Sequence, residues 1–429
     1  MREIKIGIIG FGTVGAGVVS CLLENGDVIA RRTGIKLVLS KIADIDIKTD
    51  RKVNVPKDIL TTDAMKLIEE VDVVVELVGG TTKAKEFILE ALKKGKPVVT
   101  ANKALLAEYG EEIFAAAEKS KADIYYEASV CGGIPIIKAL KEGLAGNRIN
   151  KIIGIMNGTC NYILTRMEKE HMDFEPILKE AQKLGYAESN PSLDVDGIDT
   201  AHKTAILASL AYGEWFGMKP VHVGGIRGIS VCDIKAANEL GYSIKLLGII
   251  KQEDDDVEIR VHPTLIPSES MLANIAYVFN GVMVSGTPVG ETLFYGRGAG
   301  REATASAVVA DLVDVALNLK FGSHRRVPAF TIGRQFRHIL PMSEIMSRYY
   351  MRIQVMDKPG VVAKVSTVLG NKGISISSMR QIEGQSADNV SLQIMTHLAK
   401  EQAMNEAVAE MEQLDCVKDK VTLIHVEDI

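Results

Sequence analysis

Over residues 1–126, short apolar runs alternate with longer segments whose apolar positions recur at helical spacing. Apolar, β-branched runs of this kind are typical of strands that are buried on both faces of a parallel sheet. The pattern predicts strands at 4–9, 36–43, 71–78, 97–100 and 124–126, and helices at 14–29, 83–93 and 108–122. Repeated strand–helix units predict an α/β fold with a parallel sheet, in which ligands bind beyond the carboxyl ends of the strands.

From about Tyr126 the pattern is mixed. A glycine-bearing turn precedes a helix that opens near Pro135, a strand and turn follow at 151–159, and helices continue to Leu184. A loop then leads into a helix that starts near Ile198. Beyond it we expect an α+β arrangement with a mixed sheet. Its elements are a helix and strand over 233–250, a hairpin tip at 251–256, strands at 257–261, 276–279 and 282–284, and a helix at 304–319.

The end of the chain follows a third pattern. Between Phe321 and Met342 the composition is basic and irregular, which is typical of a linker that packs across the surface. The order βαββαβ then predicts a ferredoxin-like module. Its strands are expected at 349–355, 374–381, 390–396 and 421–425, and its helices at 361–370 and 400–413.

Composition and charge narrow the class of function. The 429 residues are 47% hydrophobic and 24% charged with a net charge of −5, which excludes disordered, collagen-like and disulfide-scaffold chains. A near-neutral chain lacks the clustered basic residues that bind nucleic acid or an anionic membrane, so a small molecule is the expected partner. Five scattered cysteines predict reduced thiols. Since we find neither a membrane-length apolar run nor a basic leader, we expect a cytoplasmic location.

A glycine-rich loop joins the first predicted strand to the first predicted helix, and it reads Gly10-Phe11-Gly12-Thr13-Val14-Gly15. In this context Gly10 permits a tight turn, Gly12 allows a pyrophosphate to approach the backbone, and Gly15 allows close packing of the helix. The amino end of the helix offers free N–H groups to the phosphates. The loop therefore predicts a dinucleotide site, although glycines that only shape a tight turn would give the same pattern.

Two acidic residues follow the second predicted strand. Asp44 and Asp46 stand where an acidic side chain accepts a hydrogen bond from the adenosine ribose, which favours NAD. Lys48, Arg51 and Lys52 follow and could instead bind the 2′-phosphate of NADP, so the cofactor preference stays open. A solvated loop is an equally good interpretation of the acidic pair. By the same strand-end rule, we expect the cofactor crevice to be lined by Gly79, Gly80, Ala101, Asn102 and Lys103.

The segment from Gly185 to Lys203 is the richest in candidate chemistry. Glu188, Asp194 and Asp196 are expected on a loop, whereas Asp199 and Lys203 lie four residues apart on the next helix and therefore on one face. A lysine on a buried helix, with carboxylates close enough to tune it, suits proton transfer to a developing alkoxide. The alternative is a surface ion pair beside an acidic loop.

These motifs and several others in the same order resemble the homoserine dehydrogenase family with a C-terminal ACT domain. The resemblance covers essentially the whole length and rests on segments 10–15, 76–80, 100–103, 127–130, 157–159, 185–203 and 296–300. It implies an NAD(P)-dependent oxidoreductase that reversibly reduces L-aspartate 4-semialdehyde to L-homoserine, on the branch to threonine, isoleucine and methionine.

The resemblance also implies roles for individual residues. Lys203 is expected to donate a proton to the aldehyde oxygen, and Lys103 to be a second lysine near the nicotinamide; which of them delivers the proton stays open. Glu188 and Asp199 are expected to bind the α-ammonium group and hydroxyl of homoserine, and Asp194 and Gly185 complete the substrate site. The cofactor site is expected to comprise Gly10, Phe11, Gly12, Thr13, Val14, Gly15, Asp44, Gly79, Thr100, Lys103 and Gly298.

The turn after residue 126 holds a monovalent cation in the family, and Na⁺ is the expected ion. The resemblance places the ligands at Glu127, Val130, Gly132 and Ile134, mostly through backbone oxygens, and only Glu127 could contribute a side chain. Cys131 is interpreted as packing. Hydride transfer assisted by an ammonium group needs no catalytic zinc, so His202 is expected to pack or to bond locally.

The resemblance implies three domains and a linker. A Rossmann-type dinucleotide-binding domain at 1–130, completed by a segment near 296–320, precedes an α+β substrate-binding and dimerisation domain at 131–320, a linker at 321–348 and a ferredoxin-like ACT domain at 349–429. ACT modules pair side by side and bind amino acids. We therefore expect a homodimer or homotetramer under feedback control, with threonine as the candidate effector; a module that serves only assembly is the alternative.

Two other classes of function remain. A cofactor-sensing binding protein would keep the glycine loop and the ACT-like end, but it would have no use for Glu188, Asp199 and Lys203 together. A dehydrogenase for a different amino-acid aldehyde would share all of the chemistry, so only substrate profiling separates it from the homoserine dehydrogenase hypothesis.

Overall fold

The structure is a computed structural model that describes residues 1–323, 326, 338–383 and 389–429. The chain divides into two compact units. Unit 1 comprises Met1–Asn150, His202–Val221 and Phe279–Phe336, and unit 2 comprises Lys151–Ala201, His222–Val278 and Arg337–Ile429. Much of the predicted linker lies outside the described residues, and its described part includes the short strand β13 (His338–Ile339) and the 3₁₀ turn η4 (Met342–Glu344).

Unit 1 is built on a parallel sheet with the strand order β3-β2-β1-β4-β5-β6. The order reverses direction between β1 and β4, and in such sheets the ligand crevice lies beyond the carboxyl ends of the strands at that point. The parallel α/β sheet predicted from the apolar runs is therefore confirmed. Its strands are β1 (Arg2–Ile9), β2 (Ile35–Ala43), β3 (Leu60–Thr61), β4 (Val73–Glu76), β5 (Val98–Thr100) and β6 (Ile124–Tyr125).

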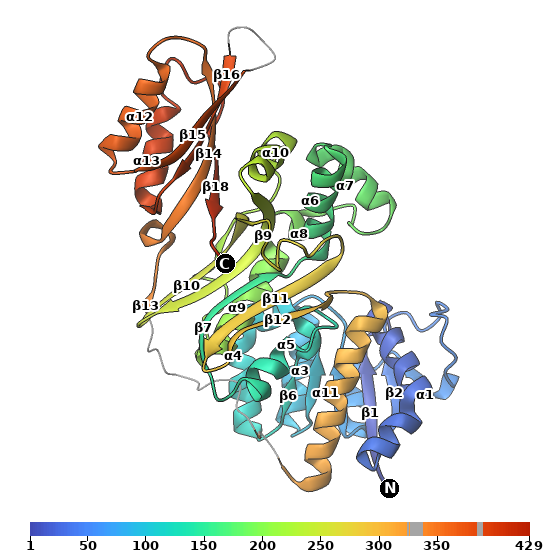
Figure 1. Ribbon diagram of the computed structural model, residues 1–429. Coiled ribbons are helices and arrows are strands. Elements are labelled where there is room, and N and C mark those ends of the chain that lie inside the picture. The colour runs from blue at the N-terminus through green and yellow to red at the C-terminus, as the bar shows by residue number, and fades with distance from the viewer. Residues whose placement is uncertain (324–325, 327–337, 384–388) are drawn as a thin grey trace. The chain divides into compact units, whose positions relative to one another are not determined.

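Helices that follow the strands complete unit 1. Helix α11 lies alongside α1 although the two are far apart in sequence (Figure 1). Helix α1 is long and apolar enough to cross a membrane by length and composition alone, but its face from Gly15 to Leu22 is buried in the core that it shares with α11. The helices are α1 (Thr13–Thr33), α2 (Ala64–Glu70), α3 (Thr82–Lys93), α4 (Lys103–Ser120) and α11 (Arg301–Phe321), with shorter turns η1 (Lys57–Ile59), η2 (Glu127–Ser129), α5 (Ile136–Lys138) and η3 (Ala139–Gly143).

Two predictions, one in unit 1 and one at the end of the unit 2 segment His222–Val278, are wrong in detail. Helix α4 begins at Lys103 and not at 108, because the Asn102 side chain accepts a hydrogen bond from the backbone of Leu105 and caps the helix. The segment at 276–278 does not belong to a strand. The strand begins at Phe279, and β11 (Phe279–Thr287) forms an antiparallel hairpin with β12 (Gly290–Arg297), which the apolar pattern did not predict.

Unit 2 contains a mixed sheet with the strand order β7-β9-β10-β18-β14-β16-β15. The C-terminal module joins this sheet because β18 pairs in parallel with β10 and antiparallel with β14. The βαββαβ order of the module is confirmed. The strands are β7 (Arg148–Ile155), β9 (Tyr242–Glu253), β10 (Asp256–Pro267), β14 (Met346–Met356), β15 (Ile376–Glu383), β16 (Asn389–Thr396) and β18 (Thr422–Val426), with the short strands β8 (His222–Val223) and β17 (Ala399–Lys400).

Two sets of helices accompany this sheet. The module has its own apolar core between its strands and the helices α12 (Val361–Asn371) and α13 (Glu401–Met411). The middle strands carry α6 (Gly158–Glu170), α7 (Phe174–Lys183), the one-turn helix α8 (Ser192–Val195) and α10 (Val231–Glu239). Asp194 was expected on an irregular loop but lies in α8. Helix α9 (Ile198–Tyr212) begins in unit 2 and ends in unit 1.

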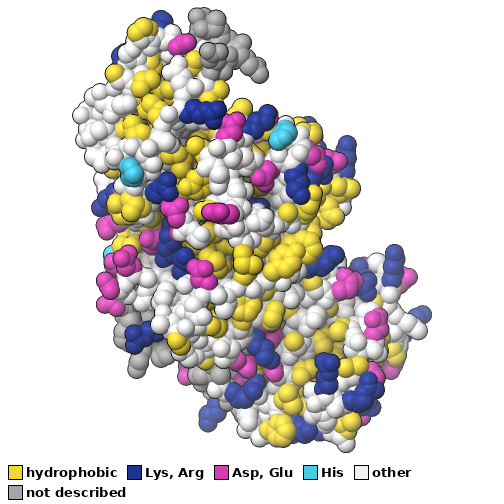
Figure 2. Space-filling model, in the orientation of Figure 1, with side chains coloured by type: hydrophobic (Ala, Val, Ile, Leu, Met, Phe, Trp, Pro, Cys, Tyr) yellow, Lys and Arg dark blue, Asp and Glu magenta, His cyan; other side chains and the backbone are white. Residues whose placement is uncertain are grey.

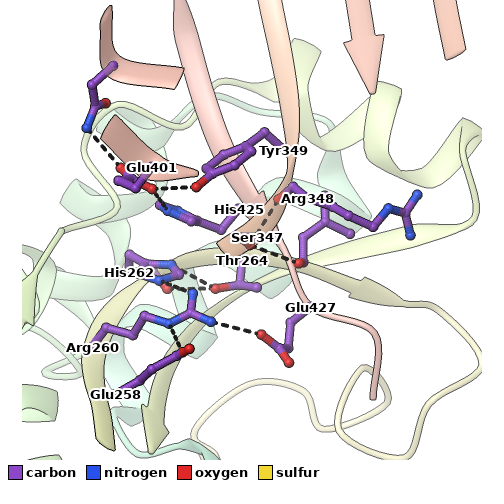
Figure 3. Close-up of polar contacts among 12 residues, drawn as sticks. Glu258, Arg260, His262, Thr264, Ser347, Arg348, Tyr349, Glu401, His425 and Glu427 are labelled. Carbon is purple, nitrogen blue, oxygen red and sulfur yellow. Dashed lines mark hydrogen bonds and ion pairs between the residues drawn. The ribbon is translucent and has the colours of Figure 1, made fainter. Parts of the chain in front are cut away.

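A buried polar cluster lies where β10 meets the C-terminal module, and we call it the polar joint (Figure 3). Tyr349 and His425 both bond to one carboxylate oxygen of Glu401, each at 2.7 Å, and the His425 ring stacks on His262 with centroids 4.0 Å apart. Arg260 contacts His262 Nε2 at 3.0 Å. On the other side its guanidinium donates to Glu427. The joint therefore ties the two parts of unit 2 together through side chains as well as through the β10–β18 ladder.

Candidate active site

The glycine loop has the geometry that a dinucleotide requires. A Cβ on Gly10, whose φ is +103°, would lie 2.5 Å from the Leu77 carbonyl oxygen, and one on Gly15 would lie 2.1 Å from that of Gly10. No atom comes within 4 Å of a Cβ placed on Gly12, which caps α1. The first and third glycines are therefore needed by the fold, while the second leaves open space at the amino end of a long helix, where a pyrophosphate fits.

The acidic residue after β2 faces this loop. Asp44 accepts the backbone N–H of Phe11 at 2.5 Å and that of Asp46 at 2.8 Å. The Phe11 ring is itself buried in the core. Each carboxylate oxygen has a second lone pair, so Asp44 still has the capacity to accept from a ribose hydroxyl.

The basic residues beyond β2 are only partly available. Hydrogen bonds from Thr49 and Lys48 lower the pKa of Asp46 to about 2, and this ionised carboxylate pairs with Arg51 at 3.2 Å. Lys48 and Lys52 are exposed. The structure therefore leaves both an acidic and a basic group near the expected ribose position.

A cleft of about 290 Å³ opens beyond the carboxyl ends of β4 and β5 in unit 1. All five residues that the strand-end rule selected line this one cleft. Its walls are Val14, Leu77, Gly79, Gly80, Ala101, Asn102, Lys103 and Ala104. Its place beside α1 and its size fit the nicotinamide half of a dinucleotide.

The cleft is held in shape by a hydrogen-bond network that starts from the buried side chains of Glu76 and Thr100. Burial raises the pKa of Glu76, and its carboxylate accepts from the hydroxyl of Thr100 at 2.7 Å. The Thr100 hydroxyl in turn accepts from the backbone of Asn102, whose amide donates to the Gly80 carbonyl at 2.6 Å. Thr100 is fully buried and absent from the cleft wall, so its hydroxyl supports the wall from behind.

The predicted cation turn packs against the Gly296–Gly300 loop. Gly133 donates to the Arg297 carbonyl at 3.0 Å, and a Cβ on Gly132 would lie 2.7 Å from the carbonyl oxygen of Gly298. The Cys131 thiol is fully buried, consistent with packing. The turn and the glycine loop before α11 are therefore one packed element of unit 1.

The Glu127 side chain is already engaged. Its two carboxylate oxygens accept the backbone N–H groups of Ile137 and Lys138, at 2.9 and 2.7 Å, so it caps the short helix α5. Burial, which outweighs these bonds, raises its pKa to about 7. A cation at this turn would therefore rely on backbone carbonyl oxygens such as those of Glu127, Val130, Gly132 and Ile134.

Unit 2 brings two of the three predicted substrate carboxylates together. Asp194 in α8 and Asp199 in α9 both accept from the amide nitrogen of Asn157, at 2.7 and 2.9 Å. Glu188 is exposed on the loop that begins at Gly185, whose φ is +77°. Asn157 belongs to a motif that carried the family resemblance, but sequence reasoning gave it no role; its position before an amphipathic helix is the signal that marks a capping residue.

Lys203 lies in an unusual position for a lysine. Helix α9 carries Asp199 and Lys203 one turn apart on one face, and each is only 8% exposed. His202 beside them is also buried, as are Ala205 to Leu210. Both charged groups are removed from solvent, so the alternative of a surface ion pair is wrong.

Comparisons with known proteins agree across the chain. The family model described as homoserine dehydrogenase matches residues 135–313, its NAD binding domain matches residues 10–127, and an ACT domain model matches residues 349–416. The homoserine dehydrogenase of Neisseria gonorrhoeae is 45% identical over 100% of both chains. The crystal structure of a homoserine dehydrogenase from Thiobacillus denitrificans has a TM-score of 0.94 and 44% identity, covering 100% of this chain and 99% of that one. A hyperthermophilic archaeal homoserine dehydrogenase in complex with NADPH has a TM-score of 0.62 and 28% identity over 74% of this chain and 98% of its own.

Proposed function

Since the chain belongs to the homoserine dehydrogenase family and interconverts L-aspartate 4-semialdehyde and L-homoserine with NAD or NADP, we propose that Lys203 is the proton donor to the aldehyde oxygen. The observation that carries this proposal is the burial of Lys203 and Asp199 on one face of α9. When bound, the nicotinamide supplies the hydride. A buried ammonium group stabilises the negative charge that grows on the oxygen and then donates a proton to it.

Lys103 is the second lysine of the proposed site. It begins α4 at the wall of the cofactor cleft, where its ammonium group would reach the reacting carbonyl beside the nicotinamide. Its proposed role is to orient and polarise that carbonyl, and it is also the alternative proton donor to Lys203. Direct comparison of the two lysine variants decides between them.

Three carboxylates form the proposed substrate site. Asp194 and Asp199, held by one amide, would bind the α-ammonium group, and Glu188 on the exposed loop after Gly185 would bind the ammonium or the hydroxyl from the solvent side. A cationic ammonium group gains more from ionised acceptors than from neutral ones, which accounts for acidic residues here.

The cofactor would be held by the loop from Gly10 to Gly15, Asp44, Gly79, Lys103 and Gly298, with Thr100 acting through Glu76 and Asn102. Na⁺ would bind the backbone oxygens of the turn at Glu127, Val130, Gly132 and Ile134. An ion there would brace the turn that packs against the Gly298 loop.

The ACT domain at 349–429 would control activity. We infer that a cytoplasmic homodimer or homotetramer pairs its ACT modules and binds threonine between them as an end-product inhibitor. The continuous pairing of β10, β18 and β14 supports this role, because it gives the module a direct mechanical connection to the middle strands.

The test is the oxidation of NADH and of NADPH with L-aspartate 4-semialdehyde, in the presence of Na⁺ or K⁺ and with or without threonine. Rapid turnover with this aldehyde, and slow turnover with other amino-acid aldehydes, supports the proposal; the rate ratio gives the cofactor preference. Turnover that is equal for several aldehydes would contradict the substrate assignment. Full activity at saturating threonine would contradict the assignment of the effector.

A further inference from the structure

Asn157 stands at the point where β7 gives way to α6, and its side chain makes bonds in two directions. Its carbonyl oxygen accepts the backbone N–H of Cys160 at 2.8 Å and caps α6. That bond leaves the amide nitrogen facing away from the helix, and it donates to Asp194 Oδ1 at 2.7 Å and Asp199 Oδ2 at 2.9 Å. Asn157 is 5% exposed, and its bonds to Asp199 and Cys160 are buried, whereas its bond to Asp194 is partly buried.

The two hydrogens of one amide thus serve two carboxylates from different elements. Carboxylates that share a site repel each other. A neutral donor that bonds to both oxygens holds the two groups together without cancelling their charge. Lysine or arginine in the same place would neutralise the pair, so asparagine is suited to a site that must attract a cation.

The same turn also fastens the acidic segment through its backbone. The Thr159 hydroxyl donates to the Tyr186 carbonyl at 2.8 Å, and the Cys160 thiol donates to the Asp194 carbonyl at 3.1 Å. A Cβ on Gly158 would lie 2.9 Å from the Val278 carbonyl oxygen, so the turn itself is tightly held. The amide of Asn157 is therefore fixed in space before any substrate binds.

We propose that Asn157 is a positioning residue that holds the carboxylates of Asp194 and Asp199 together and orients them for the α-ammonium group of the substrate. This inference rests on the substrate-binding role proposed above for the two carboxylates. Asn157 acts through them and touches no reacting atom.

Two variants of the full-length chain separate positioning from helix capping. Asn157→Ser keeps a capping oxygen of similar strength but has no donor that spans both carboxylates. It should raise the KM for L-homoserine by about tenfold or more with a smaller change in kcat and unchanged affinity for the cofactor. A KM for Asn157→Ser equal to that of the unaltered enzyme would overturn the inference.

Asn157→Asp supplies a second and independent readout. It keeps the cap and the shape but adds a third carboxylate, which must take up a proton before it can donate to a neighbour. The ratio of kcat/KM for Asn157→Asp to that for Asn157→Ser should therefore rise as the pH falls. A ratio that does not change with pH contradicts the inference.

Asp199→Asn and the double variant with Asn157→Ser distinguish the inference from the proposal on which it rests. If Asp199→Asn leaves KM unchanged, the substrate role of Asp199 fails; if it raises KM and Asn157→Ser does not, only the positioning role fails. Non-additive effects on KM in the double variant are expected if Asn157 acts through Asp199. Asp63→Ala, which removes the cap of α2 far from these carboxylates in sequence, controls for lost stability and should not change KM.

Discussion

Acid should open the polar joint by protonating His262. Arg260 can only donate, so the Nε2 atom of His262 must accept, and its proton belongs on Nδ1, which faces the Pro263 carbonyl and Thr264. Burial, followed by the nearby His425 and Arg260, holds the pKa of His262 well below its ordinary value. Protonation would place an N–H opposite the guanidinium, in a cluster that also contains His222.

The size of the effect follows from proton linkage. In the unfolded or opened chain His262 should titrate near its ordinary pKa of about 6.5. Because the folded-state pKa of His262 is depressed, the stability that neutral His262 contributes is fully present well above the unfolded-state pKa of about 6.5. This stability is lost as the pH falls below that unfolded-state pKa. The loss should reach about 1.4 kcal/mol at about pH 5.5 and be nearly zero at about pH 7.5. Burial raises the pKa of Glu401, but the hydrogen bond and charge of His425 and the hydrogen bonds from Tyr349 and Asn405 together lower it from 4.5. The stability that Glu401 contributes is therefore lost at a lower pH than that of His262.

The assay is amide hydrogen exchange of β10 and β18 at the two pH values, corrected for intrinsic exchange, in the unaltered chain and in His262→Gln. Glutamine keeps an acceptor for Arg260 but does not titrate, so other shifted groups cancel in the difference. The opening free energy should fall by about 1.4 kcal/mol between the two pH values in the unaltered chain and much less in the variant. His338→Gln, at an exposed histidine paired with Asp256, is the matched control. Equal pH dependence in the unaltered chain and His262→Gln would refute the reasoning.

Three further predictions concern the proton donor, the cofactor preference and the packing of the Gly298 loop. Lys203→Met should lower kcat by about 10²-fold or more with unchanged binding of the reduced cofactor, and a near-normal kcat would remove Lys203 from the mechanism. Lys103→Met is measured in parallel, and the proton donor is the lysine whose substitution lowers kcat more. Asp44→Asn should shift the ratio of KM for NADPH to KM for NADH by about tenfold in favour of NADPH, because it removes a charge that accepts from a ribose and repels a phosphate; an unchanged ratio counts against Asp44. Gly298→Ala should cost about 1–3 kcal/mol in thermal unfolding, because its Cβ would lie 2.0 Å from the Asn280 amide, and Asn280→Ala should recover part of the loss.

Local signals in the sequence predicted most of the fold. The apolar runs from Ile4 to Ile9 and from Val98 to Thr100 are buried strands because valine and isoleucine suit both faces of a parallel sheet. The run at 276–278 has similar letters and is not a strand. Tyr277 adopts a left-handed conformation with φ of +57°, and its N–H donates to the Thr165 hydroxyl on α6. A tertiary contact decides that backbone, so no local pattern could reveal it.

The sequence also could not predict towards which part of the structure a side chain at the end of a strand points. Both Asp44 and Asp46 are candidates for the ribose by position, yet only Asp44 turns towards the glycine loop, whereas Asp46 binds its own turn and Arg51. The difference arises from hydrogen bonds between residues more than thirty positions apart in one case and within five in the other. Sequence spacing alone cannot rank such alternatives.

One local signal could have identified the supports of the site. Asn102 and Asn157 each follow a strand, each caps the next helix with its carbonyl oxygen, and each has an amide left to donate, to the Gly80 carbonyl in one case and to two carboxylates in the other. Serine and aspartate cap helices equally well, but a capping serine has only one hydrogen left to donate and an ionised aspartate has none, whereas asparagine keeps two. A strand followed by asparagine and a helix therefore indicates more than a helix start. It marks a place where the fold has fixed a hydrogen-bond donor at the carboxyl edge of a strand, and in this chain one such place borders the cofactor cleft of unit 1 and the other holds the two carboxylates of unit 2.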